Sequence, residues 1–552
     1  MEEGFEIVPE AKVGPLEGKA VIALGCSRWA DDEELAGLSP AGFLIRRKAN
    51  VLVIAGGKSA GTYQGAVRLL DALCGVRFYM PTGLFTSAPK ERPVVPGGLA
   101  IRREPFVKSA MMSGIVGIPG DHGWVKRNGA ARRLGGTHQH SMYQMFPPSR
   151  YARSHPEIYP VIDGKRHVPA DGRDQGWQPC LSAPSLVDVA EESAVRYFRR
   201  SPDALYVAFS VQDGHKVCGC PKCRAAYEKC KAPEQRAGQA EAMGFSQLYW
   251  EFTGRLALRL QKSLPGKKIV AMVYGPARYP PKARLPEGVI LFTNFHVAEL
   301  DADRILAPDP ATGVSRLDYV LDRCRYYGNH DWYHGNGFLV PWIYSGYWSR
   351  YMRHLAAKVD GALMHAEAYP NWGLDGPKLY ILGRLWWNPE ADVRALLKQF
   401  CDDMFGPASP PMQDYFTTLE KLWITLDNVK GPERKLFLWN RQFLADADDL
   451  AAVRHCRAML TKARDAAATD RQRKRIELFS DTFLVSETLF ELASAREIRQ
   501  EQVESFRAHV RTRILPNPMT LYRTAPDAED LNKRIEDALR FATGGGKKAQ
   551  GM

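Results

Sequence analysis

The chain has 552 residues, of which 45% are hydrophobic and 25% are charged, an ordinary balance for a globular protein. Its 75 basic and 62 acidic residues give a formal net charge of +13 that is spread along the chain. The length excludes one compact core and predicts about two or three domains, and no apolar run reaches the roughly 18 residues of a membrane-spanning helix.

Residues 1–100 predict a small α/β domain. Apolar residues from Tyr63 to Cys74 recur at helical spacing, and Gly75 is the expected helix stop. Four short apolar runs predict strands, the second and third as a hairpin: Val21–Leu24, Gly42–Ile45, Val51–Ile54 and Val76–Tyr79. The first ten residues have no basic or apolar region of a signal peptide, so the chain as given is expected to carry none.

Residues 101–390 alternate between strand-like and helix-like patterns. Helical spacing runs from Ser185 to Arg199 and from Phe245 to Leu264. Strands alternating with helices predict a parallel sheet, and about eight of them predict a (β/α)8 TIM-like barrel. The predicted strands are Phe106–Met112, Arg133–Thr137, Gln178–Leu181, Leu205–Val211, Ile269–Tyr274, Val289–Phe295, Cys324–Gly328 and Gly361–His365.

Residues 391–552 predict a helical domain packed on the barrel, with a flexible glycine- and lysine-rich tail over 544–551. The densest basic run, Arg471–Arg475, lies in one of these helical patterns. We interpret it as a solvated helix face, and we expect neither a nucleic-acid partner nor a membrane span. The predicted helices are Asp392–Phe405, Met412–Leu426, Leu436–Ala468 and Ile476–Arg499.

The most specific local signal is the spacing of Cys218, Cys220 and Cys223. Three thiols this close rarely serve packing alone, and a zinc ion would need a fourth ligand. Cys180, at the end of a predicted strand, is the expected fourth ligand, and Cys230 is its rival; metal-free thiols or a loop disulfide are the alternatives. Because four thiolates leave no position for water, we predict a structural zinc and no catalytic cofactor.

Carboxylates follow three predicted strands, at the end of a barrel where active sites lie. They are Asp213, Asp331 and Glu367. Glycoside hydrolysis needs one carboxylic acid to protonate the leaving oxygen and a second carboxylate to activate water or attack the sugar. We expect Asp213 to be the acid, Glu367 its partner and Asp331 a third candidate. The alternatives are a local capping role for Asp213 and Asp331, and a buried pair with an arginine for Glu367.

Histidines and aromatic residues accompany these carboxylates. His138 and His140 have strand spacing, which places both on one face and suits either substrate hydroxyls or a metal. Flat aromatic faces suit the stacking of sugar rings. The predicted substrate-binding residues are His138, His140, His296, His330, Trp332, Tyr333 and Trp372.

Several motifs resemble a known family. They are HPEIY at His155–Tyr159, DGKR at Asp163–Arg166, CLS at Cys180–Ser182, SVQDG at Ser210–Gly214 with the following cysteines, and LWWNP at Leu385–Pro389. These are similar to bacterial proteins grouped as the domain of unknown function 4838 family, over roughly residues 50–425. GVRFYMP at Gly75–Pro81 resembles the small domain that precedes the barrel in α-glucuronidases and β-hexosaminidases.

The resemblance implies a glycosidase-like barrel and a carbohydrate substrate. It implies a glycoside hydrolase acting on polysaccharide or glycan fragments that contain uronic acid or hexosamine; a non-catalytic carbohydrate-binding barrel is the alternative. The paired Asp-Glu of hexosaminidases is Asp213-Gly214 here, which argues against their substrate-assisted mechanism. The resemblance also points to an extracytoplasmic location if the native start lies upstream. The sugar, the linkage and the oligomeric state stay open.

Overall fold

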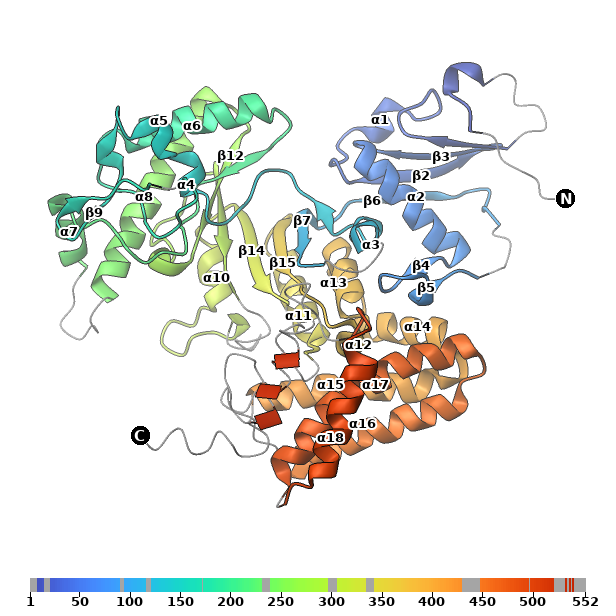
Figure 1. Ribbon diagram of the computed structural model, residues 1–552. Helices are drawn as coiled ribbons and strands as arrows, with labels where there is room; N and C mark the ends of the chain where they lie inside the picture. Colours follow the sequence, from blue (N-terminus) through green and yellow to red (C-terminus); the bar gives the residue numbers. More distant parts are fainter. Residues whose placement is uncertain are drawn as a thin grey trace.

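The structure is a computed structural model that describes residues 7–13, 20–89, 94–115, 121–170, 172–230, 239–295, 305–333, 342–428, 447–495, 497–520, 532–533, 536–537 and 539–540 (Figure 1). Among these residues, no helix is both long enough and apolar enough to cross a membrane.

A four-stranded sheet in the order β1-β3-β2-β6 forms the N-terminal part, blue in Figure 1. Strands β2 and β3 pair in antiparallel fashion, which confirms the predicted hairpin, and every residue of β3 is buried. Helix α2 (Ser59–Cys74) packs on β3 and ends where Gly75 takes a left-handed φ of 62°, as predicted. The elements of this part are β1 (Val21–Leu24), α1 (Asp32–Leu35), β2 (Phe43–Lys48), β3 (Val51–Gly56), β4 (Arg77–Phe78), β5 (Thr86–Ser87) and β6 (Ala100–Arg103).

A curled seven-stranded sheet in the order β11-β12-β13-β14-β15-β7-β8 forms the centre (Figure 1). All neighbours are parallel except β7 and β8. The carboxyl ends of the parallel strands therefore meet at one rim. The strands are β7 (Val107–Ser113), β8 (Ala131–Arg132), β11 (Tyr206–Ala208), β12 (Lys268–Met272), β13 (Val289–Thr293), β14 (Tyr326–Trp332) and β15 (Ala362–Glu367).

Alternate residues of the central strands belong to two different cores. Val270 and Phe292 lie in a small cluster inside the curl, with Tyr206, Ala208, Met272 and Ile290. Ile269 and Leu291, their neighbours in the chain, belong to the large core between the sheet and the helices. Burial on both faces explains why these strands are continuous apolar runs.

The two edges of the curled sheet approach each other at residues 131–135. Ala131 and Arg132 pair with β7, and Gly135 forms a parallel bridge with Tyr206 of β11. This bridge is what remains of the predicted strand Arg133–Thr137.

The predicted strand Gln178–Leu181 is wrong. The segment has no strand structure, and Trp177 alone forms a bridge there, with Lys216. Gln178 instead donates from its side chain to the carbonyls of Gln212 and Gly214, at 2.9 and 2.7 Å. Side-chain hydrogen bonds therefore replace most of a backbone ladder in this segment.

Two late strands are longer than predicted. β14 continues to Trp332 and β15 continues to Glu367. Asp331 and Glu367 therefore lie within strands rather than in the loops after them, and strand alternation decides where their side chains point.

Helices and short strands connect the central strands. The predicted helices from Ser185 and from Phe245 are confirmed as α6 and α8, and α8 packs against β12 and β13. The connecting elements are α3 (Asp121–Arg127), α4 (Met142–Met145), α5 (Pro148–Tyr151), β9 (Val161–Ile162), β10 (Lys165–Arg166), α6 (Leu186–Arg200), α7 (Pro221–Glu228), α8 (Gln239–Ser263), α10 (Arg316–Leu321), α11 (Ser345–Ala356), α12 (Trp372–Asp375) and α13 (Lys378–Trp387).

The C-terminal part is helical, orange to red in Figure 1, as predicted. Asp392 caps the first helix by accepting from the amides of Arg394 and Ala395, and Thr469 and Gln472 form a capping box on α17. The elements are α14 (Val393–Phe405), α15 (Ser409–Asn428), α16 (Ala447–Ala466), α17 (Asp470–Ser494), α18 (Gln500–His509) and a π-helical turn (Val510–Ile514). Residues 436–446 and the predicted tail lie outside the described residues. The domain boundaries at residues 100 and 390 stay a prediction.

Candidate functional site

Side chains from several strands meet at the carboxyl rim of the central sheet. Glu367 is the last residue of β15 and lies in register with Trp332 of β14 and Ser113 of β7. Asp213 lies in the loop after β11, and Tyr274 lies just after β12. Parallel pairing thus brings residues that are distant in the sequence to one end of the sheet.

Asp213 has two side-chain partners at its Oδ1 atom. The Tyr274 hydroxyl donates to it at 2.9 Å, and His140 Nε2 lies 3.4 Å away. His140 Nδ1 lies 3.2 Å from the Val211 carbonyl, to which it can donate. Asp213 itself is 59% exposed, so this pair of side chains faces solvent.

Glu367 lies in a more enclosed setting, with 20% of its side chain exposed. His330 Nε2 lies 3.6 Å from its Oε1 atom, and the Gln139 side chain forms a hydrogen bond with it. Burial raises the pKa of Glu367; the Gln139 hydrogen bond opposes this shift, and the negative charge of Asp213 adds to it. The two carboxylates are therefore within electrostatic reach of each other.

Tyr274 is influenced by both carboxylates. Burial raises the pKa of Tyr274 to about 12, and its hydrogen bond to Asp213 and the charges of Asp213 and Glu367 act in the same direction. The hydroxyl consequently keeps its proton near neutral pH and serves as a donor.

Three buried histidines converge one pleat deeper, beneath Glu367: His138, His330 of β14 and His365 of β15. His138 Nε2 lies 3.1 Å from His330 Nδ1 and 2.9 Å from His365 Nδ1. The ring of His138 stacks on Phe292 with 4.5 Å between centroids. Burial lowers the pKa of His138 and of His365, which keeps both rings neutral.

Two residues near the carboxylates have left-handed backbone conformations that are uncommon outside glycine. His140 has a φ of 46° and Tyr369 has a φ of 30°. Burial raises the pKa of Tyr369, and the charge of Glu367 adds to this shift. Strained backbone of this kind often occurs at functional sites.

Asp331 does not join the two other carboxylates. It follows His330 on β14, so its side chain points to the opposite face of the strand, where it is 1% exposed. Its Oδ1 accepts a hydrogen bond from the Trp332 amide at 2.7 Å. Its charge raises the pKa of Tyr333 and Tyr351 in the outer core, where burial is the larger cause.

The aromatic residues predicted to bind substrate are also divided between the outer core and the inner face of the sheet. Tyr333 packs against Tyr344 and Trp348, with ring centroids 5.7 and 4.7 Å apart, and Trp372 packs against Trp124 at 5.1 Å. Trp332 shares the face of His330 by strand alternation and lies in register with Glu367. His296 lies outside the described residues.

The sequence-based prediction missed four residues that the structure places here: Ser113, Gln139, Tyr274 and His365. Two of them could have been predicted from the strand pattern. His365 lies two positions before Glu367, so both share one face of a strand, and Tyr274 closes a predicted strand. Ser113 and Gln139 reach the site only through tertiary contacts.

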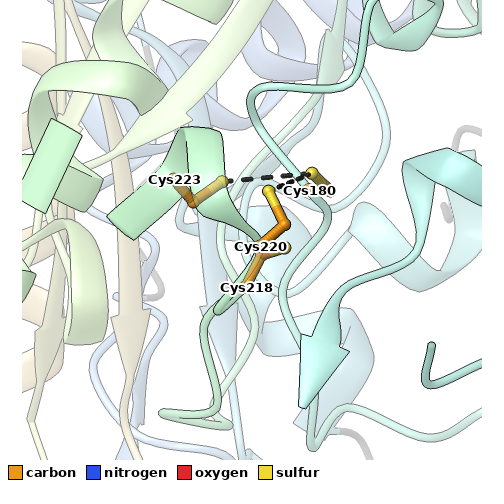
Figure 2. Close-up of side chains that lie close together, drawn as sticks. All are labelled: Cys180, Cys218, Cys220 and Cys223. Atoms are coloured by element: carbon orange, nitrogen blue, oxygen red, sulfur yellow. Dashed lines mark hydrogen bonds between the residues drawn. The ribbon is translucent and has the colours of Figure 1, made fainter. Parts of the chain in front are cut away.

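The four predicted zinc ligands form a second cluster, in which all four sulfur atoms lie within 4.8 Å of one another. Figure 2 shows Cys180 facing Cys220 and Cys223, with sulfur–sulfur distances of 3.7 and 3.9 Å. These values exceed the roughly 2.05 Å of a disulfide and match the edge of about 3.8 Å of a tetrahedron with metal–sulfur bonds of about 2.3 Å. The rival Cys230 instead contacts the Gln247 side chain at 3.7 Å.

Further hydrogen bonds surround the cysteine cluster. The Val161 amide donates to Cys218 Sγ at 3.3 Å, and Ser182 Oγ lies 3.1 Å from Cys223 Sγ. Hydrogen bonds from the Cys180 and Cys223 thiols lower the pKa of Cys218, and the Val161 amide acts in the same direction. A thiolate is the form that binds metal.

The cysteine cluster borders the loop that carries Asp213. The side chain of Gln178 holds the carbonyls on both sides of Asp213, and the Gly214 amide donates to the Gln175 carbonyl at 2.9 Å. A Cβ atom on Gly214 would lie 2.3 Å from the Gly176 backbone, so the close approach of the two segments requires glycine. The position of Asp213 therefore depends on the segment that ends at Cys180.

Comparison with known proteins gives one family match. The family model described as Domain of unknown function (DUF4838) matches residues 121–417. No curated protein matches the sequence.

The solved structures that resemble this chain include glycoside hydrolases. A family 89 glycoside hydrolase from Clostridium perfringens, in complex with 2-acetamido-1,2-dideoxynojirmycin, has a TM-score of 0.50 and 10% identity, covering 93% of this chain and 68% of that chain. A second structure of the Clostridium perfringens family 89 enzyme, in complex with its substrate GlcNAc-alpha-1,4-galactose, has a TM-score of 0.49 and 10% identity. The match covers 95% of this chain and 68% of that chain. A GH138 enzyme targeting pectin rhamnogalacturonan II has a TM-score of 0.34 and 9% identity, covering 95% of this chain and 73% of that chain.

Proposed function

Because this chain belongs to the family described as Domain of unknown function (DUF4838) and has a fold similar to that of a glycoside hydrolase, we propose that it hydrolyses glycosidic bonds. Asp213 and Glu367 are the working carboxylates in this proposal. One observation carries it: two carboxylates distant in the sequence lie at one rim, within electrostatic reach, and both act on Tyr274.

The surroundings of the two carboxylates support different roles. Glu367 is the more enclosed group and is assigned as the acid that protonates the leaving oxygen. Asp213 is exposed, accepts from Tyr274 and is assigned as the carboxylate that activates water or attacks the sugar. This assignment reverses the order expected from the sequence, because β15 extends to Glu367 and places its side chain against His330.

The rest of the rim supports substrate binding. His140, Gln139 and Tyr369 surround the two carboxylates with donors and an aromatic face. The bridge between Gly135 and Tyr206 supports a closed barrel as the scaffold. The substrate class is a glycan fragment with a hexosamine or uronic acid unit; the basic net charge of +13 favours the anionic sugar.

The cysteine cluster supports a structural zinc site in the same proposal. Its four sulfur atoms lie within 4.8 Å of one another, and four thiolate ligands would leave no position for a substrate. Zinc there would hold the Asp213 loop and would not take part in the reaction.

The experiment is a panel of aryl glycosides of N-acetylhexosamines, uronic acids and neutral hexoses, assayed with the full chain and with two variants. Asp213→Asn and Glu367→Gln are each expected to reduce kcat about 10²–10⁴-fold on the substrate that the wild type cleaves. An activated leaving group such as dinitrophenolate needs no proton, so the Glu367→Gln variant should recover on it while Asp213→Asn should not.

Asp203→Asn and Asp360→Asn are the matched controls, since these residues precede β11 and β15 at the opposite end of the sheet. Both are expected to retain wild-type turnover. Full turnover by Asp213→Asn or Glu367→Gln would exclude the assignment. Saturable binding of an oligosaccharide without product would instead indicate a carbohydrate-binding protein.

A further inference from the structure

The three histidines beneath Glu367 form a compact arrangement that the proposed hydrolysis does not require. We propose that His138, His330 and His365 bind one divalent transition metal ion, with zinc as the expected metal. This site is separate from the cysteine cluster, and the inference does not rest on the proposed reaction.

The first argument is convergence. Each histidine turns one ring nitrogen toward the same point: Nε2 of His138 and Nδ1 of His330 and His365. The three nitrogens lie within 4.8 Å of one another, and two of the separations are 2.9 and 3.1 Å. Nitrogens that bind zinc at about 2.0–2.1 Å in a tetrahedron are about 3.4 Å apart, so small movements suffice.

The second argument concerns the other ring nitrogens. His365 Nε2 lies 2.7 Å from Ser113 Oγ, and His330 Nε2 lies 3.6 Å from the Glu367 carboxylate. Histidines that bind metals usually donate their remaining N–H to a hydroxyl, a carbonyl or a carboxylate, which fixes the tautomer with the bare nitrogen toward the ion. His365 has a hydrogen-bond partner of this kind on the side away from the convergence point, and His330 turns its outer nitrogen toward a carboxylate that lies just beyond hydrogen-bond distance.

The third argument is the shortage of protons at the convergence point. A neutral imidazole has one N–H, and an N–H on His138 Nε2 can point well at only one of its two neighbours. At most one of the two short contacts of His138 Nε2, at 2.9 and 3.1 Å, can therefore be a well-directed hydrogen bond. A cation at the centre satisfies all three nitrogens at once.

The chemistry of the donors selects the class of metal. Neutral imidazoles suit zinc, copper, iron and nickel, whereas magnesium and calcium prefer oxygen. Three protein ligands would leave a coordination position for water or a substrate hydroxyl, unlike the four-thiol cluster.

The test loads the full chain with cobalt(II), dialyses it, and measures bound metal by elemental analysis together with the visible absorption spectrum. Cobalt on nitrogen ligands gives ligand-field bands only, whereas cobalt on thiolates adds a sulfur-to-metal charge-transfer band. His365→Asn keeps an acceptor near the position of Nδ1 and is expected to lose one equivalent of cobalt while the sulfur band stays. The retained sulfur band and an unchanged thermal midpoint show that the variant is folded.

A gentler variant removes only the supporting hydrogen bond. Ser113→Ala is expected to weaken cobalt binding at the histidines by about 10–100-fold. Ser109→Ala is its control, because Ser109 lies on the same strand but bonds to Tyr206 and the Leu134 amide instead of a histidine. Equal cobalt content and equal affinity in the wild type, His365→Asn and Ser113→Ala would overturn the proposal, whether or not any glycoside is cleaved.

Discussion

The two carboxylates of the candidate site differ in what surrounds them. Asp213 is open to solvent and held by Tyr274 and His140, whereas Glu367 is enclosed by Gln139 and His330. This difference in environment supports the proposal that the two carboxylates have different roles in glycoside hydrolysis.

Tyr274 offers a test of how Asp213 is held. Tyr274→Phe removes the hydroxyl that donates to Asp213 at 2.9 Å and leaves the ring in place. A hydrogen bond to a charged group contributes about 1.5–3 kcal/mol, so we expect kcat to fall roughly 10–100-fold while the thermal midpoint stays close to wild type. Steady-state kinetics and thermal unfolding measure the two effects.

Tyr319→Phe is the control for that measurement. Tyr319 lies in α10, and its ring packs against the Arg323 guanidinium instead of a carboxylate of the candidate site. Unchanged kcat in Tyr274→Phe would show that the hydroxyl contributes nothing to the reaction. Equal losses in both variants would point to a general effect of tyrosine removal.

At the scale of single residues, the sequence predicted which residue types form the site better than it predicted which face of a strand each side chain occupies. Strand endings pointed to Asp213 and Glu367, but the same reasoning selected Asp331 and Tyr333, whose side chains lie in the outer core. An error of a few residues in the predicted end of β14 moved Asp331 from a loop into a strand. Because successive strand residues face opposite sides, such an error changes which residue reaches the site.

Among the elements, the strands that were predicted well are those buried on both faces. β12 and β13 are continuous apolar runs that leave little ambiguity. The strand prediction around Gln178 failed because isolated backbone hydrogen bonds and the Gln178 side chain, and not a regular backbone ladder, hold this segment in place. Hydropathy patterns carry no information about such contacts.

The cysteine cluster provides a prediction for the loop after β11. Cys218→Ser removes one of the four clustered sulfur atoms, and we expect the protein to lose one equivalent of zinc. Without the metal, the loop over residues 212–220 is expected to become sensitive to protease. Activity is expected to fall because Asp213 is displaced. Elemental analysis, limited proteolysis and kinetics measure these effects.

Cys230→Ser is the matched control, since Cys230 lies close in sequence but its sulfur contacts the Gln247 side chain instead of the cluster. It should keep its zinc, its protease resistance and its activity. A Cys218→Ser variant with full zinc content would mean that the cluster is not the binding site.

In the whole molecule, a network of charges joins the N-terminal part to the helices that follow the central sheet. Asp71 of α2 accepts from Arg77 at 2.8 Å and from Arg384 of α13. Arg77 and Tyr79 in turn donate to Asp403 of α14, at 2.8 and 2.6 Å. The network connects segments more than 300 residues apart, so it stabilises the arrangement of the parts rather than any one element.

Asp71→Asn tests this network. It leaves Arg68, Arg77 and Arg384 partly buried beside a neutral group, which is expected to cost about 3 kcal/mol and to lower the thermal midpoint by several degrees. Glu192→Gln, which removes an exposed ion pair with Arg150, should cost less than about 1 kcal/mol. Differential scanning calorimetry of the full chain distinguishes the two, and equal shifts would argue against a joining role for Asp71.

The division of the central strands between an inner and an outer core has a practical consequence for engineering. Leu291 faces the helices, while its neighbour Phe292 supports the ring of His138. Directed evolution for heat resistance can therefore target the packing of Leu291 and its outer counterparts without changing the inner face, whereas libraries that aim at new specificity should concentrate on the alternate positions. Alternate residues of one strand can thus be varied for two different purposes, stability on the outer face and specificity on the inner face.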